Sequence, residues 1–179
     1  GPPQHWKRLK GPTLTPLTGR TGAFNPAIGR SRVIIQGKHK FKAGRQAVWD
    51  LLMDADALAD AIPGCRGLKE TAPGAFEAEL NVGVAPVKGE FSGSVKLEDL
   101  NPPDDYRMAI EGSGAPGFLK GTAHIRLEAD GDDTRLEVDG EVRIGGVIAG
   151  VGQRMLGGIA KLLMGQFFKA LEGQLAGRS

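Results

Sequence analysis

At 179 residues, with 40% hydrophobic and 25% charged side chains, the chain suits one soluble globular domain. The single cysteine, Cys65, excludes an internal disulfide, and the three histidines show no spacing typical of a zinc site. Residues 1–32 carry six basic and no acidic residues, while the remainder carries 17 basic and 21 acidic ones. The excess of positive charge therefore lies in the first 32 residues, and the net charge of +2 does not predict nucleic-acid binding by the fold.

Residues 1–31 are predicted to form a flexible basic arm, and residues 32–179 to form the folded domain. Five prolines of the arm are interleaved with glycine and threonine, and no helix or strand period persists there. A loosely packed arm is favoured over a basic tether to phosphate or to an acidic partner. Gly1-Pro2 resembles the remnant of a cleaved tag, so part of the arm is interpreted as foreign to the native chain.

The pattern of the domain predicts one strand, two short helices, six further strands and a long helix, in that order. Alternation predicts the first strand over 33–41, and short helices are expected over 43–52 and from a cap at Asp54 to Ile62. Turn residues then separate strands over 67–71, 75–82, 87–97, 106–112, 119–129 and 134–144. The last element is a long helix over about 147–175.

Because tight turns join successive strands, the predicted sheet must be antiparallel. One face of such a sheet needs a cover, and the C-terminal helix is the only predicted element large enough to supply it. We therefore predict an α+β fold of the helix-grip type: a curved antiparallel sheet of about seven strands wrapped on a long C-terminal helix, with two short helices after strand 1.

The predicted strands share an inner face that lacks Asp, Glu, Lys and Arg. His39 and Tyr106 are the obvious polar side chains on that face, so groups for acid–base catalysis would otherwise have to come from loops. Small residues such as Ala78 and Ala123 beneath a bulky helix favour a void for an apolar molecule, but a fully packed core fits the same residues equally well.

The candidate ligand-binding residues are inner-face side chains together with one apolar stripe of the last helix. They are His39, Phe76, Leu80, Val82, Phe91, Val95, Tyr106, Met108, Ile110, Leu119, Ile125, Met155, Ile159, Leu162 and Leu163. Loops would form the rim of this pocket. The candidate rim residues are Pro63, Gly64, Cys65, Pro116 and Phe118. No catalytic or metal-ligating residue is predicted.

Several local motifs favour structural interpretations. The segment 112–117 matches GxGxxG but lies between two predicted strands, which favours a hairpin loop over a dinucleotide site. Cys65 has no histidine near it in sequence, which favours inert packing over a nucleophile. His39 could donate a hydrogen bond to a ligand carbonyl, although a core histidine with a protein partner is favoured. His124 falls on the polar face, where we expect it to be solvated.

Four segments, Ile62–Cys65, Val84–Pro103, Gly112–Gly121 and Gly145–Leu156, carry a family resemblance. Over about residues 33–172 the chain resembles the carbon monoxide dehydrogenase G-subunit family of the START-like (SRPBCC) superfamily. The resemblance implies the helix-grip fold that this superfamily shares with polyketide cyclases and lipid carriers. It also implies an accessory role in recruiting a molybdenum hydroxylase of the carbon monoxide dehydrogenase type to the cytoplasmic membrane and in handling a quinone.

We therefore expect a non-catalytic accessory protein that binds an apolar guest, a quinone or lipid, and that has no covalently bound cofactor. The expected partners are this guest, the molybdenum hydroxylase and, through peripheral contact, the inner face of the cytoplasmic membrane. A cytoplasmic location is expected because the sequence shows neither a transmembrane span nor a signal peptide. Two alternatives stay open: a polyketide cyclase/dehydratase-like enzyme that uses His39 and Tyr106, and a cavity-free interaction module.

Overall fold

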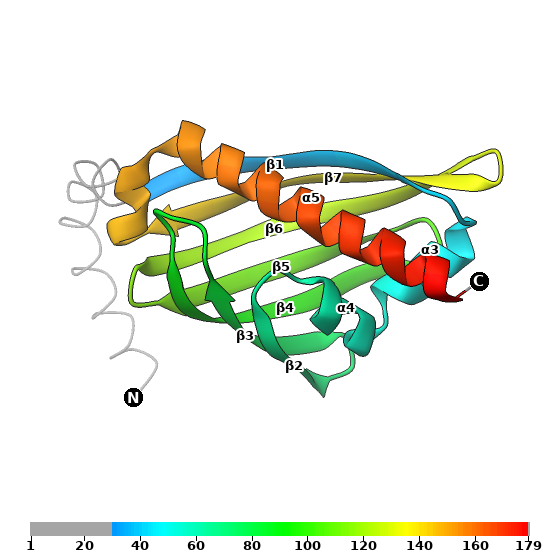
Figure 1. Ribbon diagram of the computed structural model, residues 1–179, viewed down its shortest axis with the longest axis horizontal. Coiled ribbons are helices and arrows are strands. Elements are labelled where there is room, and N and C mark those ends of the chain that lie inside the picture. The colour runs from blue at the N-terminus through cyan, green and yellow to red at the C-terminus, as the bar shows by residue number, and fades with distance from the viewer. Residues whose placement is uncertain (1–29, 179) are drawn as a thin grey trace, which may run out of the picture.

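The computed structural model describes residues 30–178 and shows one curved antiparallel sheet with a long helix lying diagonally across its inner face (Figure 1). The strand order is β1-β7-β6-β5-β4-β3-β2, and each neighbouring pair is antiparallel. The α+β helix-grip fold predicted from the sequence is confirmed.

The elements follow one another in the predicted order. Their bounds are β1 (Arg30–Phe41), α3 (Arg45–Leu52), α4 (Ala55–Ala61), β2 (Cys65–Ala72), β3 (Ala75–Val82), β4 (Gly89–Asn101), β5 (Asp105–Gly114), β6 (Gly117–Asp130), β7 (Asp133–Gly145), the 3-10 turn η2 (Val147–Val151) and α5 (Gln153–Arg178). Residues 1–29 of the predicted arm lie outside the described residues. Its last two residues, Arg30 and Ser31, already belong to β1.

Local chemistry fixes both ends of α4. Asp54 occupies the N-cap in an extended conformation, and its carboxylate accepts hydrogen bonds from the backbone N–H groups of Asp56 (3.0 Å) and Ala57 (3.3 Å). These bonds satisfy two of the donors that a helix leaves free at its start. At the other end, Pro63 cannot continue the helix, and Gly64 adopts a φ of 77° that turns the chain into β2.

Two glycines allow β6 and β7 to approach closely at the middle of the sheet. A Cβ added to Gly121 would overlap the carbonyl oxygen of Glu141, and one added to Gly140 would overlap the carbonyl oxygen of Thr122. Any other residue at these positions would therefore push the two strands apart.

The last helix begins later than the sequence predicts. The segment from Val147 to Val151 is a 3-10 turn, and Gly152 follows it with a φ of 100°. That backbone conformation is open to glycine but incompatible with a continuous α-helix. The predicted helix over 147–175 is therefore corrected to two elements, and α5 starts at Gln153.

The buried stripe of α5 is also rotated relative to the predicted one. The buried residues of the helix are Leu156, Phe168, Leu171 and Leu175. Met155 and Leu162, which were predicted to face inward, are instead 55% and 49% exposed. Apolar residues occur on most sides of this helix, so a 3.6-residue period alone does not determine which side faces the sheet.

Polar contacts attach α5 to its neighbours near both ends. The side-chain amide of Gln153 donates a hydrogen bond to the carbonyl oxygen of Arg32 in β1 (2.6 Å). Twenty-one residues later, the amide of Gln174 donates to the carbonyl oxygen of Ala57 in α4 (2.8 Å). The backbone of α5 accordingly lies closest to β1, α4 and α3, while its middle passes over the central strands (Figure 1).

Two clusters of buried side chains fill most of the space between α5 and the sheet. The larger cluster gathers around Phe41, Trp49 and Leu171, where α3, α4 and the second half of α5 meet. The smaller one gathers around Ile148 and Leu156, where η2 and the start of α5 cover the sheet. Both ends of the interior are therefore closely packed.

The orientation of α5 predicts unequal effects of two alanine substitutions on the same helix. Leu171 is fully buried, so Leu171→Ala should lower the free energy of unfolding by about 3 kcal/mol through lost burial and a residual cavity. Leu162→Ala, at a half-exposed position, should cost less than about 0.5 kcal/mol. Urea denaturation followed by circular dichroism measures both values, and equal losses would contradict the observed orientation.

Candidate ligand-binding cavity

An apolar cavity of about 350 Å³ lies between the sheet and α5. Its floor is the inner face of the sheet from β1 and β7 across to β3, and its roof is the middle of α5. Residues of α3, α4 and β2 close one side. No Asp, Glu, Lys or Arg is among the described residues that line it. The expectation of an apolar inner face with space beneath the helix is therefore met, and a cavity-free core is not what the structure shows.

The cavity brings together part of the predicted ligand-binding set. The predicted residues that line it are Phe76, Val95, Tyr106, Met108, Ile110, Ile125, Leu163 and, from the predicted rim, Pro63. They come from four strands, from α5 and from the turn after α4. The two-residue period of the strands located the correct face of the sheet.

Other predicted residues belong to the packed region beneath η2. Val82, Phe91, Leu119 and Ile159 pack against the smaller buried cluster and do not line the cavity. Leu80 is half-buried and borders an outer hollow beside β2. The physical reason is that η2 and the first turns of α5 fill this half of the inner face, which strand alternation could not reveal.

The helix residues Met155 and Leu162 do not line the cavity either, because they stand on the exposed side of α5. Two predicted rim residues, Gly64 and Cys65, follow Pro63 without lining the cavity themselves. The Cys65 thiol lies 3.5 Å from the carbonyl oxygen of Gly67, which it can reach as a weak donor.

Pro116 and Phe118 are at the η2 end of the molecule and do not form a rim. The carbonyl oxygen of Pro116 accepts a hydrogen bond from the backbone N–H of Ile148 (2.9 Å). Phe118 is 49% exposed and borders a hollow on the outer face of the sheet. The predicted rim at these two residues is therefore corrected, because the β5–β6 turn packs against η2.

His39 is held by protein groups outside the cavity. Its Nε2 lies 3.0 Å from Oε1 of Glu172 in α5, and its ring stacks on Phe168 at a centroid distance of 5.4 Å. It does not line the cavity with Tyr106. The structure therefore matches the interpretation that His39 has a protein partner, although its side chain is 28% exposed and lies at the margin of the core. It does not assemble the His39–Tyr106 pair required by the enzyme alternative.

Sequence reasoning missed the contribution of the helices and of the edge strand. The cavity residues that were not predicted from these elements are Leu52, Leu58, Ile62, Leu68, Met164, Phe167 and Phe168. The adjacent pair Phe167–Phe168, the only two consecutive aromatic residues in the chain, was the available signal. The rest of the lining consists of the inner-face residues Ile35, Leu97, Ala123, Leu136, Val138 and Val142, and of Thr122, which alternation along β6 assigns to the outer face.

Part of the cavity lining lies at the β2 edge of the sheet and on the facing side of α5. Ile62, Pro63 and Leu68 line it from one side, and Leu163 and Phe167 line it from the helix; all five are half-buried. Because β2 is an edge strand, no further strand of the sheet closes this side. These residues therefore form the side of the cavity that the strands of the sheet do not close.

A methionine and a glycine meet at the roof of the cavity. Met164 of α5 lines the cavity, and a Cβ added to Gly37 in β1 would lie 3.0 Å from its terminal methyl carbon. That distance is shorter than an ordinary carbon–carbon contact. The absence of a side chain at Gly37 therefore provides the space that Met164 occupies.

Tyr106 lies at the inner end of the cavity and is 4% exposed. Its ring meets that of Trp49 in α3 edge to face, at a centroid distance of 5.4 Å. Burial raises the pKa of the Tyr106 phenol well above its ordinary value of 10.0. The phenol is therefore protonated, and able to donate a hydrogen bond, throughout the physiological pH range.

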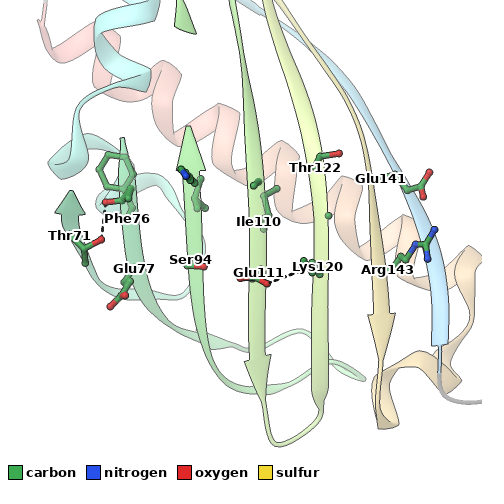
Figure 2. A pocket seen from close by; sticks show the side chains of 15 residues that line it. Thr71, Phe76, Glu77, Ser94, Ile110, Glu111, Lys120, Thr122, Glu141 and Arg143 are labelled. Atoms are coloured by element: carbon green, nitrogen blue, oxygen red, sulfur yellow. Dashed lines mark hydrogen bonds and ion pairs between the residues drawn. The ribbon is translucent and has the colours of Figure 1, made fainter. Parts of the chain in front are cut away.

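A wider hollow of about 790 Å³ lies on the opposite, outer face of the sheet (Figure 2). Charged side chains line this hollow, and several are paired with one another or with neighbours. Lys120 Nζ lies 3.4 Å from Oε1 of Glu111, and Arg32 Nε lies 3.1 Å from Oε1 of Glu141. Despite its larger volume, we do not take this hollow as the ligand site, because it is open to solvent and lined by several charged side chains, whereas the cavity beneath α5 has none.

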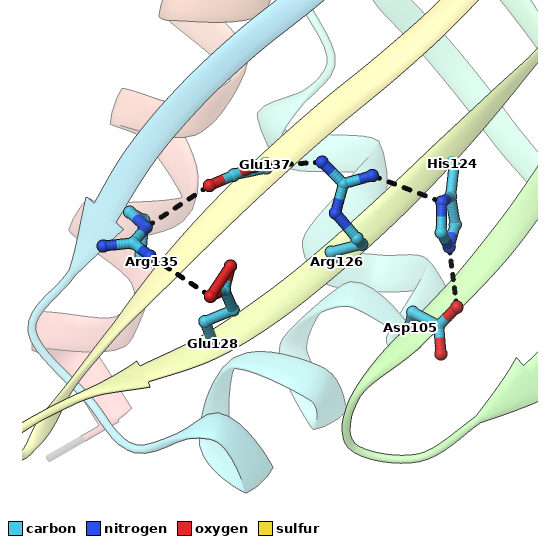
Figure 3. Close-up of polar contacts among 6 residues, drawn as sticks. All are labelled: Asp105, His124, Arg126, Glu128, Arg135 and Glu137. Atoms are coloured by element: carbon cyan, nitrogen blue, oxygen red, sulfur yellow. Dashed lines mark hydrogen bonds and ion pairs between the residues drawn. The ribbon is translucent and has the colours of Figure 1, made fainter.

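A chain of polar contacts crosses β5, β6 and β7 on the outer face (Figure 3). His124 Nε2 lies 2.6 Å from Oδ2 of Asp105, and Arg126 donates a hydrogen bond to Glu137 (2.9 Å). The hydrogen bond with His124 lowers the pKa of Asp105, and that from Arg126 lowers the pKa of Glu137. His124, expected to be solvated, is thus on the predicted face but has protein partners.

Comparisons with known proteins place the chain among related sequences. The family model that describes the G subunit of carbon monoxide dehydrogenase (CoxG) matches residues 37–176. A conserved protein from Geobacillus kaustophilus is 34% identical, with a TM-score of 0.78, over 80% of this chain and 95% of that one. The comparison with curated proteins gives no match.

Two more distant solved structures share the fold. A START superfamily protein from Mycobacterium smegmatis is 16% identical, with a TM-score of 0.68, over 82% of this chain and 99% of that one. The Zhui aromatase/cyclase from Streptomyces sp. R1128 is 17% identical, with a TM-score of 0.60, over 83% of this chain and 96% of that one. Within residues 30–178, no helix is both long and apolar enough to cross a membrane.

The buried phenol predicts a specific loss of stability at alkaline pH. In the unfolded chain Tyr106 ionises near pH 10, while in the folded protein its pKa is higher, so stability is intact below pH 10 and falls above it. The wild type should lose up to about 1.4 kcal/mol per pH unit above about pH 10 relative to Tyr106→Phe. Urea unfolding of both proteins at about pH 9 and about pH 11 measures this difference. An identical pH dependence of the two proteins would contradict a raised pKa.

Proposed function

This chain belongs to the CoxG family, that of the carbon monoxide dehydrogenase G subunit, and on that premise we propose that it is a non-catalytic carrier for an apolar molecule, a quinone or a lipid. The observation that carries the proposal is the apolar cavity of about 350 Å³ between the sheet and α5. A guest would bind there without a covalent bond, because burial of its apolar surface contributes roughly 25 cal/mol per Å².

The size of the cavity limits what enters it. Its volume lies at the lower end of the range of sites that enclose small molecules. The ring system of a quinone, or part of an acyl chain, suits such a space. A long isoprenoid or acyl tail would exceed it and leave through the side flanked by Pro63 and Phe167.

We extend the proposal to the protein partner of the carrier. The family takes its name from a component of carbon monoxide dehydrogenase, and the resemblance implies an accessory to a molybdenum hydroxylase of that type. In this role the chain would carry a quinone between the membrane and the enzyme. Family membership supports this step, and the cavity supplies the required binding space.

The exposed side of α5 supports peripheral contact with a membrane surface. Met155 and Leu162 are large, apolar and half-exposed, and Arg154, Lys161 and Lys169 are exposed on the same helix. The one acidic side chain in the described part of α5, Glu172, is bonded to His39. A helix face that combines cations with apolar side chains suits an anionic bilayer surface.

The cyclase/dehydratase alternative receives less support from the site. The likeness to an aromatase/cyclase, at 17% identity, concerns the fold alone. Acid–base chemistry on a bound substrate needs positioned proton donors and acceptors. Among the described residues that line the cavity, Tyr106 is the one titratable side chain, and its pKa is raised away from neutrality.

A substitution that fills the cavity should abolish binding without unfolding the protein. Val95 lines the cavity from β4, so the larger side chain of Val95→Phe should occupy the space of the guest. We expect at least about a tenfold loss of affinity for 2,3-dimethyl-1,4-naphthoquinone, measured by equilibrium dialysis. The thermal midpoint should not fall, since overpacking a solid core costs about 1–3 kcal/mol but filling a void does not.

The matched control is Val147→Phe, the same change at a position that is 81% exposed, which should bind like the wild type. Solvent extraction of the protein from its native host, followed by mass spectrometry, should yield a quinone or lipid. Failure of the wild type to bind the probe, together with extracts free of quinone and lipid, would refute the carrier function.

The basic face of α5 predicts salt-sensitive binding to anionic vesicles. Lys161→Glu should weaken sedimentation with phosphatidylglycerol-containing vesicles at least fivefold, because each cation near an anionic surface contributes about 1 kcal/mol. Lys96→Glu makes the same change in charge on the outer face of the sheet and should have a smaller effect. Equal losses for the two variants would show that net charge, and not the α5 face, governs binding.

A further inference from the structure

The hydroxyl group of Tyr106 has no hydrogen-bond partner among the described residues, although the residue is 4% exposed. A buried hydroxyl without a partner is costly, at about 1–3 kcal/mol, and native proteins seldom leave one. Its neighbours explain the missing bond, because the ring packs on Trp49 and β5 places the residue opposite Ile125 of β6. Neither of these two neighbours carries a side-chain oxygen that could accept the phenol proton.

The open space beside the Tyr106 hydroxyl is best accounted for by the apolar cavity, because the residue lines that cavity. Arg135 Nε is the one buried side-chain polar atom that lacks a hydrogen bond within residues 30–178. The Tyr106 hydroxyl lacks a partner without being such a fully buried atom, so it keeps a small exposed area. Tyr106 lines the apolar cavity, and it lines none of the three hollows on the outer face of the sheet described above or beside β2.

The chemistry of the phenol restricts the group it can bind. Burial keeps it protonated at neutral pH, so it offers one O–H donor to a ligand. A carboxylate in this lining would be removed from water without a cation to balance it, which is far more costly than burying a neutral carbonyl that accepts one hydrogen bond. The cavity therefore favours an uncharged acceptor.

The position of Tyr106 also gives a direction to the guest. The phenol is at the inner end, where Trp49 and Leu52 of α3 are buried. The half-buried residues Pro63 and Phe167 flank the side that the strands of the sheet do not close. A guest bound by the phenol would enter with its polar end first and direct its apolar remainder to that side.

We propose that the Tyr106 hydroxyl donates a hydrogen bond to a neutral carbonyl oxygen at the leading end of the guest, and that this bond selects carbonyl compounds over hydrocarbons and carboxylates. This inference rests on the proposed carrier function, since it assigns the polar contact within the same cavity. It adds a residue that determines specificity and an orientation for the ligand.

The test compares two probes of matched shape. 2,3-Dimethyl-1,4-naphthoquinone carries two carbonyl groups and has no open ring position for attack by Cys65, whereas 2,3-dimethylnaphthalene lacks the carbonyls. By equilibrium dialysis, Tyr106→Phe should bind the quinone about five- to tenfold more weakly than the wild type, as expected for one lost hydrogen bond. It should bind the hydrocarbon at least as tightly as the wild type. A parallel change for both probes would overturn the inference.

A second measurement does not depend on a variant. Tyr106 is the only tyrosine in the chain, so protein labelled with ¹³C at the phenol carbon of tyrosine gives one resonance. The quinone should shift this resonance with the sign expected for a donated hydrogen bond, and the hydrocarbon should not. Equal shifts with the two probes would overturn the proposed contact.

The outcomes separate this inference from the carrier function. If the wild type binds neither probe, the carrier function fails and the inference fails with it. If the wild type binds both probes and Tyr106→Phe alters neither affinity, the carrier function stands and the anchoring role of Tyr106 is refuted. A charge preference is tested with decan-2-one and decanoate, and tighter binding of decanoate would overturn the selection of neutral guests.

Discussion

The cavity depends on the attachment of α5 at both of its ends, which holds the middle of the helix away from the sheet. The helix is fastened to β1 through Gln153 and to α4 through Gln174, and side chains pack closely beneath both of its halves. Between these supports the central strands curve beneath the helix, and the residues of its middle turns face a space they do not fill. Ordinary hydrophobic packing at the two ends therefore stabilises a void in the middle, because the helix cannot descend without breaking those contacts.

The sheet separates two kinds of chemistry. Its outer face carries the acids and bases, which neutralise one another in pairs such as Arg126–Glu137, and its inner face carries aliphatic and aromatic groups. Side-chain alternation makes this separation automatic once the strands have a two-residue pattern. In such a lining the Tyr106 hydroxyl would have an influence that it would lack at a polar site, since no charged side chain competes with it for the polar end of a guest.

The sequence predicted the sheet and its faces well because each depends on local or periodic features. Alternation defined the strands, and Asp54 marked the start of α4 by a capping bond that needs only neighbouring residues. The rotation of α5 was mispredicted at Met155 and Leu162, because apolar residues nearly encircle the helix. The site was predicted in part, since a strand period shows which side a residue such as Phe91 faces but not how far along the strand the interior stays empty.

The contact between Met164 and Gly37 has a consequence for the range of molecules that the chain can accommodate. Methionine is unbranched and turns about several single bonds at little cost, so this part of the lining can reshape itself while the main chain stays still. A rigid branched side chain at position 164 would have fixed the shape of the cavity wall. A carrier with this lining would therefore discriminate only weakly between guests of different shape. It would bind related compounds that differ by a methyl group or by a ring substituent.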